Sequence, residues 1–212
     1  ALYRSAREVG GDFYDFIELS DGQIGITVGD VTDKGAPAAL VMASTQGLLR
    51  ADAPRLESPS AVLERVNEVL VHNTPERMFA TCLYISLDTA SGRLQFANAG
   101  HSLPYLVTVD GVAELRATGM PLGLMPGSTY ELKQAAMSTG SRLLLHSDGL
   151  AEAQNREGEM FGLPRLVKVI ESCPRDESLI DAALAELARF TGSDWEQEDD
   201  ITLVMLKRLE DG

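Results

Sequence analysis

Residues 13–31, FYDFIELSDGQIGITVGDV, decide the fold, because they contain two strand-like runs joined by a short turn. The runs are rich in aromatic and β-branched residues, and the turn at 20–22 ends in a glycine that readily takes a positive φ. We therefore predict a β-hairpin. Asp12 precedes the first run, Asp15 interrupts it and Asp30 lies near the end of the second. A carboxylate is costly to bury without a partner, so each of these acids needs one.

The rest of the chain predicts helices and short strands that are grouped apart from one another. Two helices follow the hairpin, and the second has Ser58 as its N-cap and Pro59 at its first helical position. The later strand-like runs are separated by turns too short for parallel crossovers, which implies antiparallel neighbours. We predict an α+β fold with antiparallel sheets. The predicted helices are 36–51, 58–73, 163–172 and 177–192, and the further strands are 79–88, 93–100, 104–111, 142–149 and 199–209.

Composition argues against several classes of function. The formal net charge is −14, from 18 basic and 32 acidic residues, which disfavours nucleic acids and anionic membranes as partners. No apolar run approaches the length of a membrane span. Cys82 and Cys173 are too few for a disulfide framework, and Cys82 lies in an apolar strand, where we expect a small core residue. A reducing, cytoplasmic location fits this usage.

The aspartates fall at junctions between strands and turns. Asp12 begins a strand, Asp30 and Asp148 end strands, and Asp199 and Asp200 precede the last one. Asx turns and helix caps explain many single aspartates near glycines, but they explain the whole set less well. If these strand ends share one rim, each pair of carboxylates about 5 Å apart repels by roughly 3 kcal/mol at an effective dielectric constant near 20. Cations would neutralise the cluster, and oxygen ligands without His or Cys favour Mg²⁺ or Mn²⁺ over zinc.

Six motifs together resemble the SpoIIE/RsbU-type serine phosphatases, the bacterial branch of the metal-dependent PP2C (PPM) phosphatases. They occur in the order of that family and run along almost the whole chain. The resemblance therefore implies a single domain over residues 1–212, which we expect to be the C-terminal part of a longer protein. The motifs are VGGDFYDF (9–16), VGDVTDKGAPAALVMA (28–43), NAGHSLPYLV (98–107), PLGL (121–124), LLLHSDGLAEA (143–153) and DDITLVML (199–206).

The resemblance implies an α/β/β/α sandwich of two antiparallel sheets flanked by helices, with a site for two Mn²⁺ or Mg²⁺ ions at one end. It also implies that the backbone carbonyl of Val31 binds metal. Asp200 stays open as an alternative to its neighbour Asp199, which we favour; adjacent strand residues point to opposite faces. The acids that match catalytic, metal-binding positions of the family are Asp12, Asp30, Asp148 and Asp199.

Two other features of the first motif follow from strand geometry. Asp15 comes three residues after Asp12, so a regular strand turns it to the other face. We expect Asp15 to make a supporting or turn contact rather than to bind metal. Gly10 and Gly11 are expected to let the chain bend so that Asp12 reaches the site.

The remaining polar residues give weaker signals. Lys34 either touches the substrate phosphate or is a solvated loop residue, and Arg4 and Arg7 are weak candidates for binding phosphate. Asn98 and His101 either support the fold by hydrogen bonds or lie near the site. The sequence contains no CxxxxxR nucleophile loop, and its GDVTDKGAP segment lacks the GK[ST] ending of a Walker A motif.

The resemblance implies a protein serine/threonine phosphatase that hydrolyses a phosphoserine or phosphothreonine monoester with a metal-activated water. It further implies a role in bacterial stress signalling, with a phosphorylated STAS-domain protein of the anti-anti-sigma-factor type as substrate. An upstream sensory or coiled-coil segment is expected to regulate it, and a homodimer stays open. Two alternatives remain: a catalytically weak PP2C-like module that binds a phosphoprotein, and a two-metal phosphodiesterase or nuclease.

Overall fold

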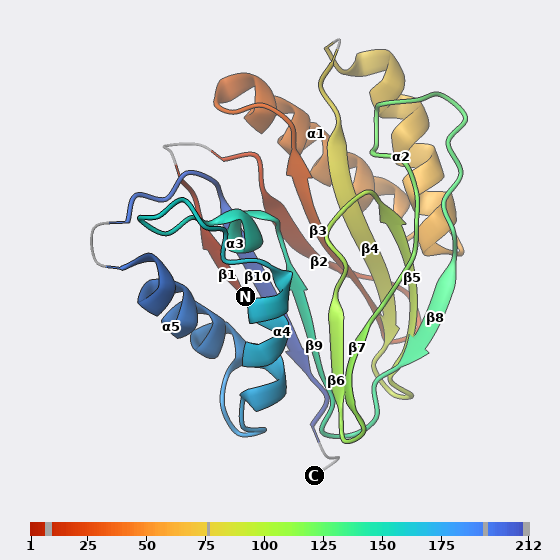
Figure 1. Ribbon diagram of the computed structural model, residues 1–212. Helices are drawn as coiled ribbons and strands as arrows, with labels where there is room; N and C mark the ends of the chain where they lie inside the picture. Colours follow the sequence, from red (N-terminus) through yellow and green to blue (C-terminus); the bar gives the residue numbers. More distant parts are fainter. Residues whose placement is uncertain (7–9, 76, 193–194, 210–212) are drawn as a thin grey trace.

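The computed structural model describes residues 1–6, 10–75, 77–192 and 195–209. Its centre consists of two antiparallel sheets of five strands each, packed face to face (Figure 1). The first sheet has the order β2 (Phe13–Glu18), β3 (Gln23–Val31), β4 (Ala80–Asp88), β5 (Arg93–Ala99) and β8 (Lys133–Ala136). The second has the order β1 (Leu2–Arg4), β10 (Ile201–Lys207), β9 (Arg142–His146), β6 (Tyr105–Thr108) and β7 (Gly111–Glu114).

Helices cover the outer faces of both sheets, which confirms the predicted α/β/β/α sandwich. The first pair packs on the first sheet and the last pair on the second (Figure 1). None of the helices in the described ranges is long and apolar enough to cross a membrane. The helices are α1 (Ala36–Asp52), α2 (Pro59–Asn73), α3 (Gly149–Glu152), α4 (Leu163–Ser172) and α5 (Leu179–Thr191).

Local sequence signals explain how these elements begin and turn. Strands β2 and β3 form the predicted hairpin, and Asp21 and Gly22 take φ values of 56° and 72° at its turn. Two successive positive φ angles suit the twist of a type I′ hairpin turn. Ser58 is the N-cap of α2, because its side chain accepts a hydrogen bond from the Ala61 amide at 3.3 Å.

The core follows the four layers. Apolar side chains of both sheets, such as Ile26, Leu83 and Leu143, fill the space between the sheets. Separate apolar clusters join each helical pair to the outer face of its sheet. This packing fixes the positions of the strand ends, and these ends carry the acids of the predicted site.

The structure also contains short elements that we did not predict, namely β1, β7, β8 and α3. Each has only three or four residues, which gives too few positions for a periodic pattern. Strand β1 matters for the site, because it pairs with β10 next to the acidic motif of residues 199 and 200.

Candidate metal centre

Four strand ends place the predicted acids at the same end of the sandwich. Asp12 directly precedes β2, and Asp30 is the penultimate residue of β3, its antiparallel partner. Asp148 follows β9, and Asp199 precedes β10, which is again an antiparallel pair. Antiparallel neighbours bring the start of one strand to the end of the next. The two hydrogen-bonded pairs, one from each sheet, thus present their acids at a common rim.

Asp12 is a buried carboxylate that the opposite sheet holds in place. The residue is 3% exposed, and Thr202 Oγ1 donates a hydrogen bond to Asp12 Oδ2 at 2.7 Å. Burial, followed by the charges of Asp30 and Asp200, raises the pKa of Asp12 to about 8, against the opposing hydrogen bonds from Thr202 and Ser147. The charged form of Asp12 therefore needs a positive partner to be stable at neutral pH.

Asp30 is the carboxylate most surrounded by other acids. Its pKa is raised to about 7, first by burial and then by Asp148, Asp199 and Asp200. Its neighbour Val31 turns its carbonyl oxygen toward Gly11: a Cβ built on Gly11 would lie 2.7 Å from Val31 O and 3.1 Å from Asp30 Oδ1. The missing side chain of Gly11 thus keeps a space into which two oxygens point.

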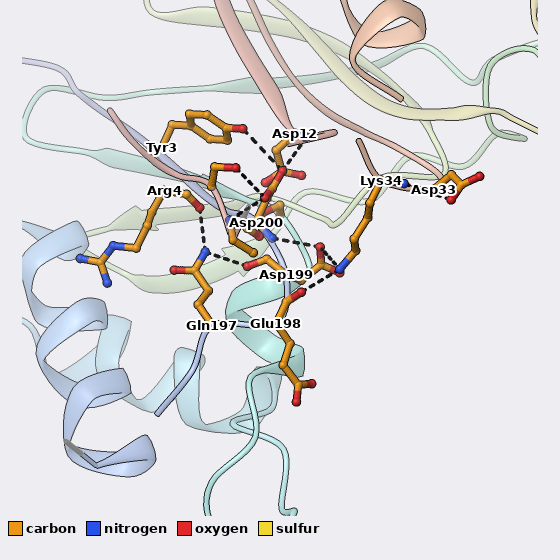
Figure 2. A network of polar contacts seen from close by, with 12 residues as sticks. Tyr3, Arg4, Asp12, Asp33, Lys34, Gln197, Glu198, Asp199 and Asp200 are labelled. Atoms are coloured by element: carbon orange, nitrogen blue, oxygen red, sulfur yellow. Dashed lines mark hydrogen bonds and ion pairs between the residues drawn. The ribbon is translucent and has the colours of Figure 1, made fainter. Parts of the chain in front are cut away.

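Asp148 and Asp199 complete the rim on the side of the second sheet. Asp148 is an exposed residue, but partial desolvation of its carboxyl group raises its pKa, and the charge of Asp199 raises it further. The Asp199 side chain is 48% exposed and forms an ion pair with Lys34, with 3.0 Å between Asp199 Oδ1 and Lys34 Nζ (Figure 2). A cation from the chain itself therefore already lies against this carboxylate.

Asp200 has a different environment from Asp199 (Figure 2). Its buried carboxylate accepts hydrogen bonds from the amides of Ala6 at 2.9 Å and Asp12 at 3.3 Å. The hydroxyls of Ser5 and Tyr3 donate to the same carboxylate at 3.3 and 3.5 Å. Asp200 thus ties the N-terminal segment to the backbone of Asp12, whereas Asp199 is the member of the pair that faces Lys34.

Gly10 shows how closely these parts are packed. A Cβ built on Gly10 would lie 1.8 Å from Asp200 Oδ2, far inside any real contact distance. The two glycines of the first motif thus allow close approach as well as a bend in the chain.

We expect Gly10→Ala to push the Asp200 carboxylate out of place and to lower the melting temperature by about 4–8 °C, the effect of about 2 kcal/mol of overpacking in a domain of this size. Thermal unfolding followed by circular dichroism measures this. Gly47→Ala in helix α1 is the matched control, since a Cβ there meets nothing within 4 Å. A Gly10→Ala protein as stable as the Gly47→Ala protein would contradict the packing described.

Asp15 lies apart from the other acids, as strand alternation predicts. It is buried on the face of β2 that also carries Phe13 and Ile17, toward the helices. It forms an ion pair with Arg50 of α1 and accepts a hydrogen bond from the Phe16 amide. Asp15 therefore connects β2 to α1 and takes no part in the acidic rim.

Asn98 and His101 support the backbone of the site. Asn98 closes its loop by hydrogen bonds to the backbone nitrogen and oxygen of His101, at 2.7 and 2.9 Å. His101 Nδ1 lies 2.9 Å from Thr81 Oγ1, which donates to the carbonyl of Asp30 at 3.3 Å. His101 and Thr81 thus connect the loop of residues 98–101 to the backbone of Asp30.

Sequence reasoning missed the hydroxyl residues that hold the acids. Thr202 orients Asp12, Thr81 contacts the Asp30 carbonyl, and Ser147 Oγ donates to the backbone oxygen of Asp200 at 3.3 Å. Ser147 and Thr202 both lie inside the quoted motifs, within three positions of a predicted acid. That position was a usable signal, but the contact between Thr202 and Asp12 crosses from one sheet to the other.

The other candidates have clear positions too. The guanidinium of Arg4 points away from Asp12 and Asp200 (Figure 2), and Arg7 lies outside the described residues. Cys82 is fully buried, and its pKa is raised to about 12 by that burial. Cys173 is buried near the carbonyl groups of the segment between α4 and α5. Both thiols are therefore structural, as a small core residue should be.

The residues of the rim fit a hard divalent cation by their chemistry. All donors are oxygens, as a hard cation prefers. Gly11 leaves a space beside two of them, Val31 O and Asp30 Oδ1. The carboxylate of Asp199 already contacts one cation, the Lys34 ammonium. The rim is open rather than a closed cage: among the residues with described positions, no three acidic, histidine or cysteine side chains are gathered closely enough to hold an ion.

Comparison with known proteins agrees with this architecture. The family model of stage II sporulation protein E (SpoIIE) matches residues 20–209. The phosphoserine phosphatase RsbU of Bacillus subtilis is 28% identical over 98% of this chain, which spans 62% of that protein. Among solved structures, the RsbU and RsbW domains of Rv1364c from Mycobacterium tuberculosis are 31% identical, with a TM-score of 0.78 over 98% of this chain and 58% of theirs.

The SiaA-PP2C domain of Pseudomonas aeruginosa has the higher structural similarity, with a TM-score of 0.83 at 25% identity, over 97% of this chain and 84% of that one. The sandwich of two five-stranded sheets is thus a PP2C-type phosphatase fold. With the family model matching most of its length, the chain belongs to the SpoIIE family of PP2C-like serine phosphatases.

Proposed function

We propose that this protein is a serine/threonine phosphatase that hydrolyses phosphoserine or phosphothreonine monoesters with two bound Mn²⁺ or Mg²⁺ ions. The observation that carries the proposal is the group of four acids at one rim of the sandwich, two of which have pKa values raised to about 7 and 8. In the proposed site the ligands are the carboxylates of Asp12, Asp30, Asp148 and Asp199 and the carbonyl oxygen of Val31.

The divalent ions would neutralise the charge of the phosphate group and lower the pKa of a bound water. The chain's own part is to hold and orient these ligands. Thr202 donates a hydrogen bond that orients the Asp12 carboxylate. Thr81 donates one to the backbone carbonyl of Asp30 and so fixes the backbone there. Because both thiols are buried, direct attack by water is proposed rather than a thiol-phosphate intermediate.

Hydrolysis of p-nitrophenyl phosphate by the purified chain tests this proposal. Turnover should require Mn²⁺ or Mg²⁺, stop in excess EDTA, and exceed turnover of bis(p-nitrophenyl) phosphate by a large factor. Preference for the diester would favour a phosphodiesterase, and phosphoprotein binding without turnover would favour a catalytically weak module.

The partner is proposed from the relatives. RsbU bears the name phosphoserine phosphatase, so we propose a phosphoserine protein as substrate, of the STAS-domain, anti-anti-sigma-factor type, in the cytoplasm. The chain spans less than two thirds of RsbU, and we propose regulation by a sensory or coiled-coil segment upstream. Dephosphorylation of a purified phospho-STAS protein, compared with a phosphoserine peptide, measures this preference.

The distinct environments of Asp199 and Asp200 give a paired prediction. Asp199→Asn should lower Mn²⁺-dependent turnover at least about tenfold with little change in melting temperature, because it removes a ligand charge at the rim. Asp200→Asn should lower the melting temperature by about 4–8 °C, because its carboxylate accepts several hydrogen bonds. The reverse pattern would identify Asp200 as the metal ligand.

A further inference from the structure

We propose that Lys34 binds the phosphate group of the substrate, and that it pairs with Asp199 when no divalent cation does. This inference rests on the proposed phosphatase function and names a further substrate-binding residue of that site. It starts from a contact between the two halves of the sandwich: Lys34 follows β3 of the first sheet, and Asp199 precedes β10 of the second.

The ammonium group of Lys34 has two partners in the loop before β10 (Figure 2). Its Nζ donates to the carbonyl oxygen of Glu198 at 2.7 Å and lies 3.0 Å from Asp199 Oδ1. A lysine ammonium has three N–H donors, so these two contacts within the described structure leave one donor for a ligand. The carbonyl of Glu198 bears no net charge, and it can keep the ammonium at the rim when Asp199 has another partner.

The loop that carries Lys34 is shaped to direct this side chain. Thr32 fixes its start, because the Thr32 amide donates to Phe79 O and the Phe79 amide donates to Thr32 Oγ1, both at 3.0 Å. Asp33 and Gly35, on either side of Lys34, have φ values of 76° and 82°. Two left-handed residues flanking one lysine turn the backbone sharply on both sides. Lys34 thus follows only four residues after Asp30 and still reaches the opposite sheet.

Charge also singles out Lys34. The chain has a net charge of −14, and the four acids of the rim repel a phosphate dianion. Among the ion pairs of the described residues, the pair of Lys34 with Asp199 is the one that joins a basic side chain to these four acids. Arg4 points away from the rim (Figure 2). Lys34 is therefore well placed to offset the charge of a phosphate bound at the rim.

Lys34 and Asp199 also line one small pocket beside the rim. Its volume is about 160 Å³, and its wall includes Gly149, Glu152 and Trp195. This is about the space of five water molecules. The Lys34 ammonium thus lies where the rim meets this pocket, and a phosphate group bound at the rim would be within its reach.

The two roles of Lys34 predict effects of opposite sign for Lys34→Gln. Loss of the ammonium frees Asp199, so Mn²⁺ binding in the absence of substrate should become about two- to fivefold tighter, the size of an exposed ion pair. Loss of a charged hydrogen bond to phosphate should raise the KM for p-nitrophenyl phosphate and the inhibition constant of inorganic phosphate about tenfold. The value of kcat should change much less, because ground state and transition state both lose this contact.

Isothermal titration calorimetry with Mn²⁺ and steady-state kinetics with inorganic phosphate as inhibitor measure these effects. Lys34→Arg should keep most of the phosphate affinity, because it keeps the charge. Lys133→Gln is the matched control: Lys133 also forms an exposed ion pair, with Glu131 at 2.6 Å, but on strand β8. It should leave all three constants unchanged.

The outcomes separate this inference from the proposed function. If the wild-type protein shows metal-dependent turnover and Lys34→Gln leaves the phosphate inhibition constant unchanged, the role of Lys34 alone would be overturned. Looser rather than tighter Mn²⁺ binding in Lys34→Gln would overturn its pairing with Asp199 as described. A wild-type protein without metal-dependent turnover would overturn both the proposed function and the role of Lys34.

Discussion

Asp30→Asn is expected to lower Mn²⁺-dependent turnover at least about a hundredfold while leaving the fold intact. Asp30 is the acid that the other acids of the rim surround, since burial and then the charges of Asp148, Asp199 and Asp200 raise its pKa. An amide in its place removes one negative charge and one oxygen donor from the proposed site. Loss of charge stabilisation by bound metal costs several kcal/mol in a transition state, and each 1.36 kcal/mol is a factor of ten in rate.

The same variant should not unfold. Removing a charge from a group of repelling carboxylates relieves repulsion, so the metal-free Asp30→Asn protein should be as stable as the wild type or more so at pH 8. Asp110→Asn, in the exposed turn between β6 and β7, makes the same chemical change outside the rim and should keep wild-type turnover. Full turnover by Asp30→Asn, or equal losses in both variants, would contradict the proposed ligand set.

The metal-free protein is expected to lose stability as the pH rises from about 6.5 to 8, with a fall in melting temperature of about 5 °C. The folded-state pKa values of Asp12 and Asp30 are raised to about 8 and 7 from an ordinary value of 3.8. The folded state therefore binds more protons than the unfolded state above pH 4, and stability falls until the pH passes the folded-state pKa values.

The buried histidines set the lower limit of this window. Burial lowers the pKa of His101 to about 3, and it also lowers that of His146. These groups act in the opposite direction, because the unfolded chain binds their protons up to about pH 6.5. Above that pH the unfolded chain loses most of its histidine protons, so the raised pKa values of the rim acids, chiefly Asp12 and Asp30, determine the trend.

Thermal unfolding in EDTA at pH 6.5, 7.25 and 8 measures the effect, and 5 mM Mn²⁺ supplies the comparison. Since bound cations favour deprotonated carboxylates, the stabilisation by Mn²⁺ should grow over the same range. Asp30→Asn should reduce the fall in EDTA. A melting temperature in EDTA that rises with pH, in both the wild type and this variant, would contradict the electrostatics of the rim.

The positions of the acids along the chain could be predicted, because they depend on local patterns. The alternation and the turn glycine in residues 13–31 predict the hairpin, and a hairpin by itself brings Asp12 and Asp30 to one end. Alternation within β2 likewise separates Asp15, which contacts Arg50, from Asp12. The family motifs supplied the layered arrangement of the sheets, which short strands and turns alone did not specify.

Contacts between the two sheets could not be predicted in this way. Thr202 meets Asp12 and Lys34 meets Asp199 only because the sheets stack in one particular orientation. The choice between Asp199 and Asp200 depends on the N-terminal segment, whose three-residue strand β1 is too short for any periodic signal. The need for glycine at position 10 has the same origin, since its neighbour is the Asp200 carboxylate from the far end of the chain.

Calorimetric titration of the purified chain with Mn²⁺ at pH 8 tests the central claim most directly, because it counts the ions that the acids hold. We predict two ions per chain for the wild-type protein and weaker binding of at least one of them in Asp30→Asn. We also predict that hydrolysis of a phosphoserine peptide rises with occupancy of the site. Absence of Mn²⁺ binding, together with full phosphoserine hydrolysis in EDTA, would contradict it.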